Sequence, residues 1–452
     1  MRTPIADFVK EYAEKKGSRF HMPGHKGRAF LGCEAYDITE IAGADALYEA
    51  DGIIAESERN ASELFGTART LFSAEGSSQC IRAMLKLAEG YWQEKYRRNE
   101  RPYVIAARNV HKAFIYAAAL VDFDVVWLYP QEMHSLCSCH ITAMQLEDEI
   151  TKQMKERNGM TPMGVYVTSP DYLGGQLEIS ELAEVSHRYD TVLLVDNAHG
   201  AYLHFLEGKL HPMDLGADIC CDSAHKTLPV LTGGAYLQIS KNAPGYFVDH
   251  AKQAMVLFGS TSPSYLVMAS LDLCNDYLEN GYTERLAEIV KKIEDVQKKL
   301  RQSGWLVEKT DPLKLTIRSS AEKSGIDIAE QLRVAGIECE YADEQYIVLM
   351  ATPENTSADF EKLVEVLGEN QACIESDAAL SPVYCKQKIT IRQAVFGRQE
   401  KVSIEDSLEK ICGMPTVACP PAIPIVIAGE EINEDAIQLF KHYGVDEVMV
   451  VK

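Results

Sequence analysis

Apolar positions between about residues 70 and 240 fall into short runs that are separated by longer stretches with helical spacing. The runs cover residues 71–74, 104–107, 125–128, 164–167, 192–195 and 219–221, and a helix-like stretch over 79–89 follows the first. These runs are apolar on both faces, as buried parallel strands are. The alternation of strand and helix predicts a mostly parallel α/β sheet. We therefore expect ligands at the carboxyl ends of its strands.

The pattern changes after residue 240. A long helical pattern covers about residues 266–301, and five elements follow in the order strand, strand, helix, strand, helix, at 305–309, 313–318, 326–334, 346–350 and 358–367. The tail from about residue 379 contains a proline-rich stretch, which we expect to cap the small domain. The sequence thus predicts a large domain with its N-terminal segment over 1–280, a small α/β domain over 281–375 and a C-terminal extension over 376–452.

Charge and targeting signals exclude several classes of protein. The formal net charge of −22 opposes binding to nucleic acid. Residues 1–16 mix apolar and charged positions, so they predict a short amphipathic helix and not a signal peptide. No apolar run reaches the ~20 residues that span a bilayer. We expect a cytoplasmic protein that binds neither nucleic acid nor membrane.

The twelve cysteines are scattered, which is typical of reduced thiols. One group, His134, Cys137, Cys139 and His140, raises the alternative of a metal-binding protein. Its spacing is not a common zinc pattern and no second ligand pair follows nearby. We therefore expect no metal there, and elemental analysis for zinc would test the alternative.

The strongest local feature is Lys226, in a segment that reads Asp-Ser-Ala-His-Lys-Thr over residues 222–227. A lysine directly after a strand can form an imine with an aldehyde, and the small and hydroxyl side chains around it can bind a phosphate. Taken alone, Lys226 is better explained as a surface lysine, because lysine is rarely buried.

Asp196 changes that interpretation, because it ends the apolar run over 192–195, thirty residues before Lys226. This separation is that of one βα crossover unit. A buried aspartate is costly unless it is paired, and the protonated pyridine nitrogen of pyridoxal 5′-phosphate (PLP) is a suitable partner. The alternative is a helix N-cap, with Asn197 and Ala198 opening the helix.

Two further motifs follow earlier strands. Glu75-Gly76-Ser77-Ser78 lies between a strand and a helix, where backbone amides and two hydroxyls suit a phosphate. An ordinary serine N-cap is the alternative. His111 follows the run over 104–107 and could stack on a pyridine ring, or be a hydrogen-bonded loop residue.

In this order the motifs resemble those of the ornithine/lysine/arginine decarboxylase family of fold-type-I PLP enzymes, in a short form without the N-terminal wing domain. The resemblance covers almost the whole chain. The segments that carry it lie at 20–27, 65–66, 75–78, 108–112, 168–170, 196–200, 223–229, 260–265 and 420–424.

The resemblance implies a role for each matching residue. Lys226 would hold PLP as a Schiff base, Asp196 would pair with the pyridine nitrogen, and His111 would stack on the ring. The residues implied to hold the phosphate or position the lysine are Gly76, Ser77, Ser78, Ser223 and His225, while Ala198 and His199 would lie beside the ring. Thr261 and Ser262 would reach the phosphate of a neighbouring subunit's cofactor, which implies a homodimer with shared active sites.

The activity implied is decarboxylation of arginine, lysine or ornithine to an amine and CO₂, in polyamine biosynthesis. Lys226 or His225 would then protonate Cα, so the expected catalytic residues are Lys226, His225, Asp196 and His111. An aminotransferase or lyase for another amino acid, or a non-catalytic PLP-binding relative, are the alternatives. Arg392 could bind the substrate carboxylate or be a surface residue, and the sequence does not select among the three amino acids.

Overall fold

The computed structural model describes residues 1–15, 17–96, 100–320, 322–369, 380, 382–415 and 422–452. Residues Pro420 and Pro421 of the C-terminal motif therefore lie outside the described residues. Two compact units make up the chain: the first contains residues 1–102, 154–167 and 179–283, and the second contains 103–153, 168–178 and 284–452. The predicted domain bounds stay a prediction. None of the helices in the described ranges combines the length and apolar character that crossing a membrane requires.

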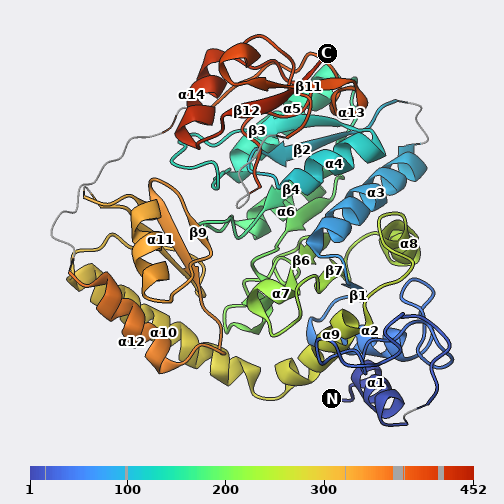
Figure 1. Ribbon diagram of the computed structural model, residues 1–452. Coiled ribbons are helices and arrows are strands. Elements are labelled where there is room, and N and C mark those ends of the chain that lie inside the picture. The colour runs from blue at the N-terminus through green and yellow to red at the C-terminus, as the bar shows by residue number, and fades with distance from the viewer. Residues whose placement is uncertain (16, 97–99, 321, 370–379, 381, 416–421) are drawn as a thin grey trace. The chain divides into compact units, whose positions relative to one another are not determined.

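Seven strands follow one another in one sheet in the order β1-β7-β6-β5-β4-β2-β3 (Figure 1). Their bounds are β1 Arg69–Ser73, β2 Tyr103–Ala107, β3 Asp124–Leu128, β4 Gly164–Thr168, β5 Leu193–Asp196, β6 Ile219–Asp222 and β7 Ala235–Ile239. The pairs β2–β3 and β5–β6 are parallel, whereas β7 is antiparallel to both β1 and β6. The predicted mostly parallel α/β fold is confirmed, and β7 is a strand that the sequence reasoning did not single out.

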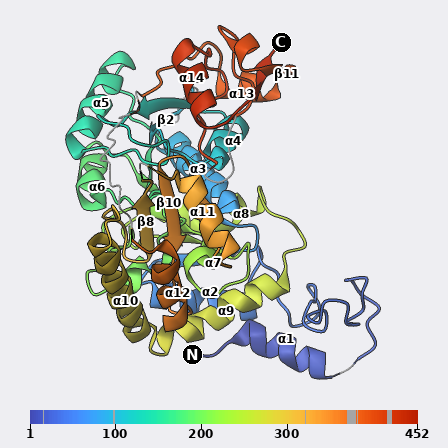
Figure 2. The same ribbon diagram turned by 60° about the vertical axis from the view of Figure 1, so that its left-hand side comes forward.

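Helices of the first unit are α1 Pro4–Glu14, α2 Ile53–Leu64, α3 Ser77–Tyr96, α6 Ile179–Arg188, α7 Ala224–Thr227, α8 Gly245–Val256 and α9 Tyr265–Glu279, with a 3₁₀ turn η1 at Ala201–Phe205. The predicted N-terminal amphipathic helix is α1, which buries Ile5, Ala6 and Val9. It packs with α2 against α9 (Figure 2). Asp272 of α9 accepts the N–H groups of Ile5 and Ala6, both at 2.9 Å, and so caps the start of α1.

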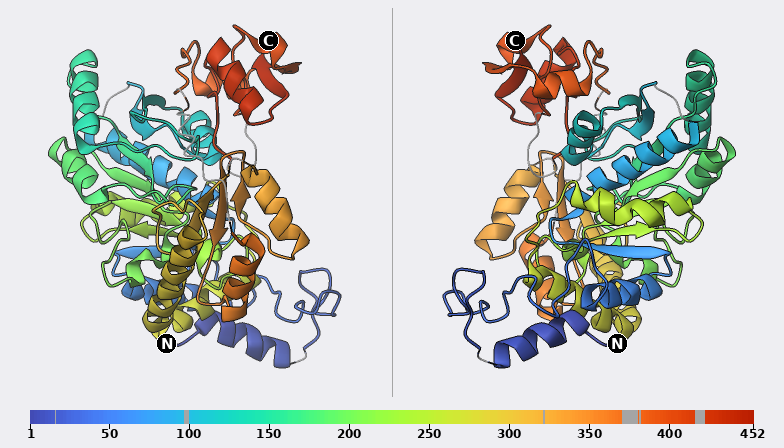
Figure 3. Two further views of the ribbon diagram at one scale, coloured as in Figure 1. Left: turned by 90° about the vertical axis from the view of Figure 1, so that its left-hand side faces the viewer. Right: turned by 90° about the vertical axis from the view of Figure 1, so that its right-hand side faces the viewer.

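The second unit contains a three-stranded sheet in the order β8-β10-β9 and a two-stranded sheet of β11 and β12. Bounds are β8 Lys314–Arg318, β9 Tyr341–Ala342, β10 Tyr346–Met350, β11 Gln399–Ser403 and β12 Glu447–Val451. The helices are α4 Lys112–Val121, α5 Ala143–Glu156 (whose last turn belongs to the first unit), α10 Tyr282–Gln302, α11 Gly325–Val334, α12 Ser357–Leu367, α13 Ile391–Phe396 and α14 Glu434–His442. Helices α11 and α12 pack against each other (Figure 3).

Four of the five elements predicted for residues 305–368 are present as β8, α11, β10 and α12. The predicted strand over 305–309 is wrong: the segment contributes a single bridge, from Val307 to Ile317. The single long helix over 266–301 is also wrong, because α9 ends at Glu279 and α10 begins at Tyr282. Between them Gly281 has φ +74°, a left-handed conformation that ends a helix and that glycine adopts without strain.

Candidate active site

Asp196 is the last residue of β5, and only 2% of it is exposed. Its carboxylate accepts a hydrogen bond from the hydroxyl of Tyr166 at 3.2 Å and from the N–H of Ala198 at 3.2 Å. The N-cap alternative is wrong, because the next helical turn, η1, has Gly200 at its N-cap. Burial raises the pKa of Asp196, and the nearby charge of Lys226 acts in the opposite direction. A cation held against this carboxylate would favour its ionised form.

Lys226 lies in α7, the short helix that follows β6. Strands β5 and β6 are parallel neighbours, so their carboxyl ends lie at the same edge of the sheet. The side chain of Lys226 is half-buried, and its Nζ lies 2.9 Å from Nε2 of His199. The surface-lysine interpretation does not fit this position. The turn that follows Asp196 thus supplies the imidazole that contacts Lys226.

A pair of hydroxyls lies at the start of α3. Ser77 is the first residue of this 20-residue helix, and its Oγ lies 2.8 Å from Oγ of Ser223. Ser78 is half-buried in the same first turn. Gly76 precedes them with φ +72°, and its N–H donates to the carbonyl of Gly233 at 2.7 Å. A helix N-terminus with two hydroxyls is suited to a phosphate.

His225 is held next to Lys226 by two hydrogen bonds to one carbonyl. Its Nδ1 lies 2.9 Å from the oxygen of Gly234, and its backbone N–H donates to the same oxygen at 3.2 Å. A carbonyl oxygen only accepts, so Nδ1 carries the proton, and Nε2 of the neutral ring is the basic nitrogen.

Thr261 and Ser262 are exposed, in the segment that leads into α9. The N–H of Ser260 donates to the carboxylate of Glu75, and the N–H of Ser262 donates to Oγ of Ser260 at 3.1 Å. Glu75 directly precedes Gly76, so the segment is tied to the loop in front of α3. That Thr261 and Ser262 serve a neighbouring subunit stays a prediction.

His111 belongs to the second unit, where it is the N-cap of α4 and its Nδ1 accepts the N–H of Ala113 at 3.1 Å. Its stacking on a cofactor ring stays a prediction. Arg392, in the same unit, donates from its Nη1 to the carbonyls of Ala119 and Leu120, at 2.8 and 3.4 Å. The guanidinium therefore satisfies the last carbonyls of α4, which favours a structural role for Arg392.

Sequence reasoning missed two residues that contact Asp196. One is Tyr166 of β4, whose hydroxyl donates to Oδ2, and the other is Cys221 of β6, whose Sγ lies 3.6 Å from Oδ1. Cys221 is the register partner of Asp196. Side chains of register partners point to the same face of a sheet. The alternation of side chains along β6 was therefore the signal from which Cys221 could have been predicted.

The cysteine and histidine group at residues 134–140 does not assemble into a set of ligands. Cys137 and Cys139 are buried, and Sγ of Cys139 donates to the carbonyl of Leu128 at 3.5 Å. Burial raises the pKa of Cys137 to about 12 and that of Cys139 to about 11, which opposes thiolate formation. Within the described ranges, the side chains that approach a metal-like arrangement are His211, Cys220 and Asp222.

The groups at the ends of β5, β6 and β1 match the three functional groups of PLP. A buried carboxylate suits a protonated ring nitrogen, the amine of Lys226 suits an aldehyde, and the helix start with Ser77 suits a phosphate. All three belong to the first unit, and the buried carboxylate of Asp196 is the group most in need of a cationic partner.

Residues 3–317 match the family described as Orn/Lys/Arg decarboxylase, major domain. The chain is 29% identical to an arginine decarboxylase of Bacillus subtilis, over 97% of this chain and 93% of that protein. It is 28% identical, with the same coverage, to a Bacillus subtilis protein named uncharacterized protein YaaO. The crystal structure of the Francisella novicida lysine decarboxylase LdcF is similar in fold, with a TM-score of 0.82, 17% identity, and coverage of 100% of this chain and 81% of that chain. The chain therefore belongs to the Orn/Lys/Arg decarboxylase family, and it is a carboxy-lyase whose cofactor is PLP.

Proposed function

We propose that the chain decarboxylates a basic amino acid at the site around Lys226, and that arginine is its first substrate to test. The observation that carries the proposal is the contact of Lys226 with His199 beside the buried carboxylate of Asp196. Relatives that the chain matches over nearly its whole length and that are named arginine decarboxylase support arginine over lysine and ornithine. The amine product would serve polyamine biosynthesis.

Lys226 has two tasks in this proposal. It would hold the cofactor through its amine, and that amine would carry a proton while the substrate is bound. His199, whose Nε2 is 2.9 Å away, shares that proton, so the pair can deliver it to Cα after CO₂ has left. The bound cofactor supplies the electron sink that accepts the electron pair of the broken C–C bond.

Asp196 would hold the ring nitrogen in its protonated form. The hydroxyl of Tyr166 and the N–H of Ala198 donate to its carboxylate and favour the ionised state that this task requires. His225 offers its basic Nε2 at the site, since Gly234 occupies Nδ1. His111 would stack on the ring, as the resemblance to the family implies.

Gly76, Ser77, Ser78 and Ser223 would hold the phosphate at the start of α3. The positive end of a 20-residue helix and the hydroxyl pair of Ser77 and Ser223 provide charge and hydrogen bonds without a basic side chain.

A substrate panel tests the activity. Purified protein with PLP is incubated with arginine, lysine or ornithine, and CO₂ and the amine are measured. We expect release of CO₂ from at least one, and its loss in Lys226→Ala. Lys291→Ala, which removes an exposed lysine of α10, should keep full activity. No CO₂ from any of the three would refute a basic amino-acid decarboxylase and favour an aminotransferase or another lyase.

We also propose a homodimer in which Thr261 and Ser262 reach the partner's phosphate. Their exposure, and the link from Ser260 to Glu75, support this role. Coexpression of Lys226→Ala with Thr261→Asp tests it. Each variant alone should be inactive, and a mixed dimer should contain one intact site of two. Because random pairing makes about half of the dimers mixed, about a quarter of wild-type activity should return. No recovery in a verified mixed dimer would refute sharing.

For the location of the protein we propose the cytoplasm. The cysteines that the structure describes are free thiols, which is the state that a reducing compartment maintains.

A further inference from the structure

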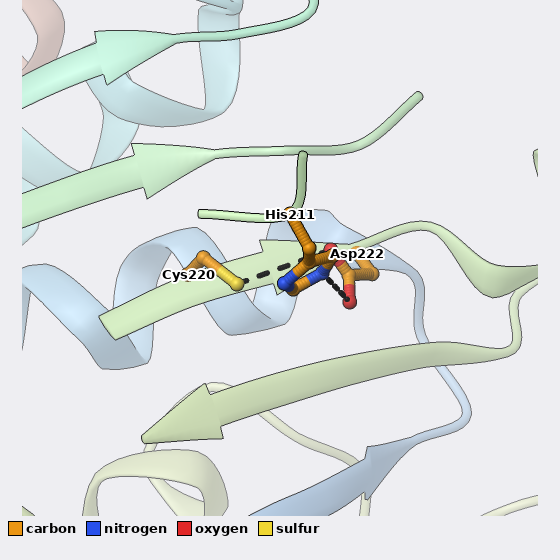
Figure 4. Close-up of side chains that lie close together, drawn as sticks. All are labelled: His211, Cys220 and Asp222. Carbon is orange, nitrogen blue, oxygen red and sulfur yellow. Dashed lines mark hydrogen bonds and ion pairs between the residues drawn. The ribbon is translucent and has the colours of Figure 1, made fainter. Parts of the chain in front are cut away.

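Asp222 ends β6 one residue before Ser223, and no part of it is exposed. Its carboxylate accepts from Nδ2 of Asn197 at 2.5 Å, from Nε2 of His211 at 3.2 Å, and from the side-chain amide of Gln238. We call these four residues the Asp222 cluster. His211 itself is fully buried, and Figure 4 shows its ring directed at the carboxylate. All four belong to the first unit.

The nearness of His211, Cys220 and Asp222 is that of a small metal site, because their ligand atoms lie within 4.8 Å of one another. The protonation pattern argues for a different role. Nδ1 of His211 accepts the N–H of Met213 at 3.2 Å, so the ring proton is on Nε2, which donates to Asp222. Burial raises the pKa of Cys220 well above its usual value, so this group is a thiol. The carboxylate is thus surrounded by hydrogen-bond donors, as a buried anion must be.

The alternation of side chains along a strand places Asp222 on the opposite face of the sheet from Asp196. Asp196 and Cys221 are register partners and share a face of the sheet, so Asp222, the next residue, points to the other face. Asn197 follows Asp196 and reaches that same far face, where it meets Asp222. The hydrogen bond between Asn197 and Asp222 therefore joins the ends of β5 and β6 on the face of the sheet opposite to Asp196.

Each strand end carries residues of the proposed site. The turn after β5 supplies Ala198, which donates to Asp196, and His199, which contacts Lys226. The turn after β6 supplies Ser223 and Lys226. Asp196 and Lys226 must both reach one ligand. A shift of Asn197 relative to Asp222 would change the distance between Asp196 and Lys226, and would therefore disturb binding of that ligand.

Gly200 leaves room for the side chain of Asn197. A Cβ at this position would lie 2.0 Å from Oδ1 of Asn197, a distance that no real contact allows. A side chain at residue 200 must therefore displace the amide that bonds to Asp222.

We propose that Asp222 is a positioning residue of the active site, with His211 as its buried donor. It acts through Asn197, by fixing the turn that holds Asp196 and His199 against the turn that holds Ser223 and Lys226. This inference rests on the cofactor roles proposed above for Asp196 and Lys226.

The test compares two changes of His211 in the full chain. Gln at 211 can place its amide N–H where Nε2 donates, whereas Leu removes the donor. We measure the dissociation constant of PLP and the pH midpoint of the visible absorbance of bound PLP. His211→Leu and Gly200→Ala should weaken PLP binding at least about tenfold and shift the midpoint, and His211→Gln should restore both toward wild type. Asp222→Asn should resemble His211→Leu if it folds.

His187→Leu is the matched control, because it removes another histidine–aspartate contact of the first unit, that of His187 with Asp218 at 2.9 Å. It should lower the melting temperature and leave PLP binding unchanged. The proposal is overturned if His211→Leu lowers only the melting temperature, or if wild-type protein contains one zinc per chain that His211→Leu loses. A drop in PLP affinity in His211→Leu, with no decarboxylation by wild type, would support positioning and refute the proposed activity instead.

Discussion

The Nζ of Lys226 lies 2.9 Å from Nε2 of His199. Both side chains are on turns that follow parallel neighbouring strands, and His199 is buried with 4% exposed. An imidazole at this distance can accept a proton from an ammonium group or return it to the neutral amine. The relationship makes His199 a candidate for proton transfer at the reacting carbon, together with the lysine itself.

His199→Gln should lower kcat about a hundredfold while the dissociation constant of PLP stays within about threefold of wild type. Gln keeps a polar side chain near Lys226, but it does not titrate, and positioned proton transfer contributes about 10²–10⁴-fold to rate. The pH profile of kcat should lose one limb in the variant. His187→Gln, a change outside the site, should leave both limbs intact, and an unchanged profile in His199→Gln would assign His199 to packing alone.

Tyr166→Phe should weaken PLP binding by roughly three- to tenfold. The hydroxyl donates to Oδ2 of Asp196 at 3.2 Å and lowers the pKa of that carboxyl, so its removal favours the neutral acid. A net hydrogen bond of about 0.5–1.5 kcal/mol gives this range. Equilibrium titration with PLP measures it. Tyr96→Phe removes a phenol hydroxyl that contacts Thr161 at the far end of α3 and should not alter the affinity.

Asp196→Asn should stabilise the protein without PLP and impair PLP binding. Burial raises the folded pKa of Asp196 above the 3.8 of the unfolded chain, so the stability that protonation provides is present at low pH and is lost as pH rises through the folded pKa. Above the folded pKa the variant removes a buried charge, so its melting temperature without PLP should there exceed that of the wild type by a few degrees. PLP affinity should fall at least about tenfold. Equal melting temperatures of the variant and the wild type across the whole pH range would contradict the cost of the buried carboxylate.

The sequence was sufficient to predict six of the seven strands of the large sheet and the positions of Lys226, Asp196 and Ser77, because each of these residues ends or follows a strand whose apolar run is unambiguous. The end of a helix at a single glycine was harder to predict. Gly281 divides one apolar helical pattern into α9 and α10, and the pattern on either side gives no sign of the break.

Contacts between distant segments could not be predicted. Asn197 reaches Asp222 across 25 residues, and Tyr166 reaches Asp196 across 30, through the pairing order of strands that periodicity does not encode. His211 gave no local signal, since the role proposed for it depends on the carboxylate of Asp222, which is buried on the opposite face of the sheet from Asp196. The alternation of side chains along a strand limits the possible contact partners of a residue only when the neighbouring strand is known.

Asp272 should make the stability of the protein depend on pH in a definite window. It is fully buried in α9, where it accepts the N–H groups of Ile5 and Ala6 and the hydroxyl of Ser57. Burial raises its pKa to about 6, from 3.8 in the unfolded chain. The folded protein thus binds a proton that the unfolded chain has lost. The stability from this proton is complete below about pH 4 and is lost as pH rises through about 6.

Asp272→Asn removes this titration and keeps an oxygen that can accept from Ile5 and Ala6. One pKa unit corresponds to about 1.4 kcal/mol, so the free energy of unfolding of the variant relative to wild type should rise by up to about 3 kcal/mol between pH 4 and pH 7. Urea unfolding at both values, followed by circular dichroism, measures the difference. Asp276→Asn, one turn further along α9 at a partly exposed carboxylate that pairs with the N-terminus, should not show this rise. A constant difference between Asp272→Asn and wild type would mean that the three donors hold Asp272 ionised in the folded protein throughout this range.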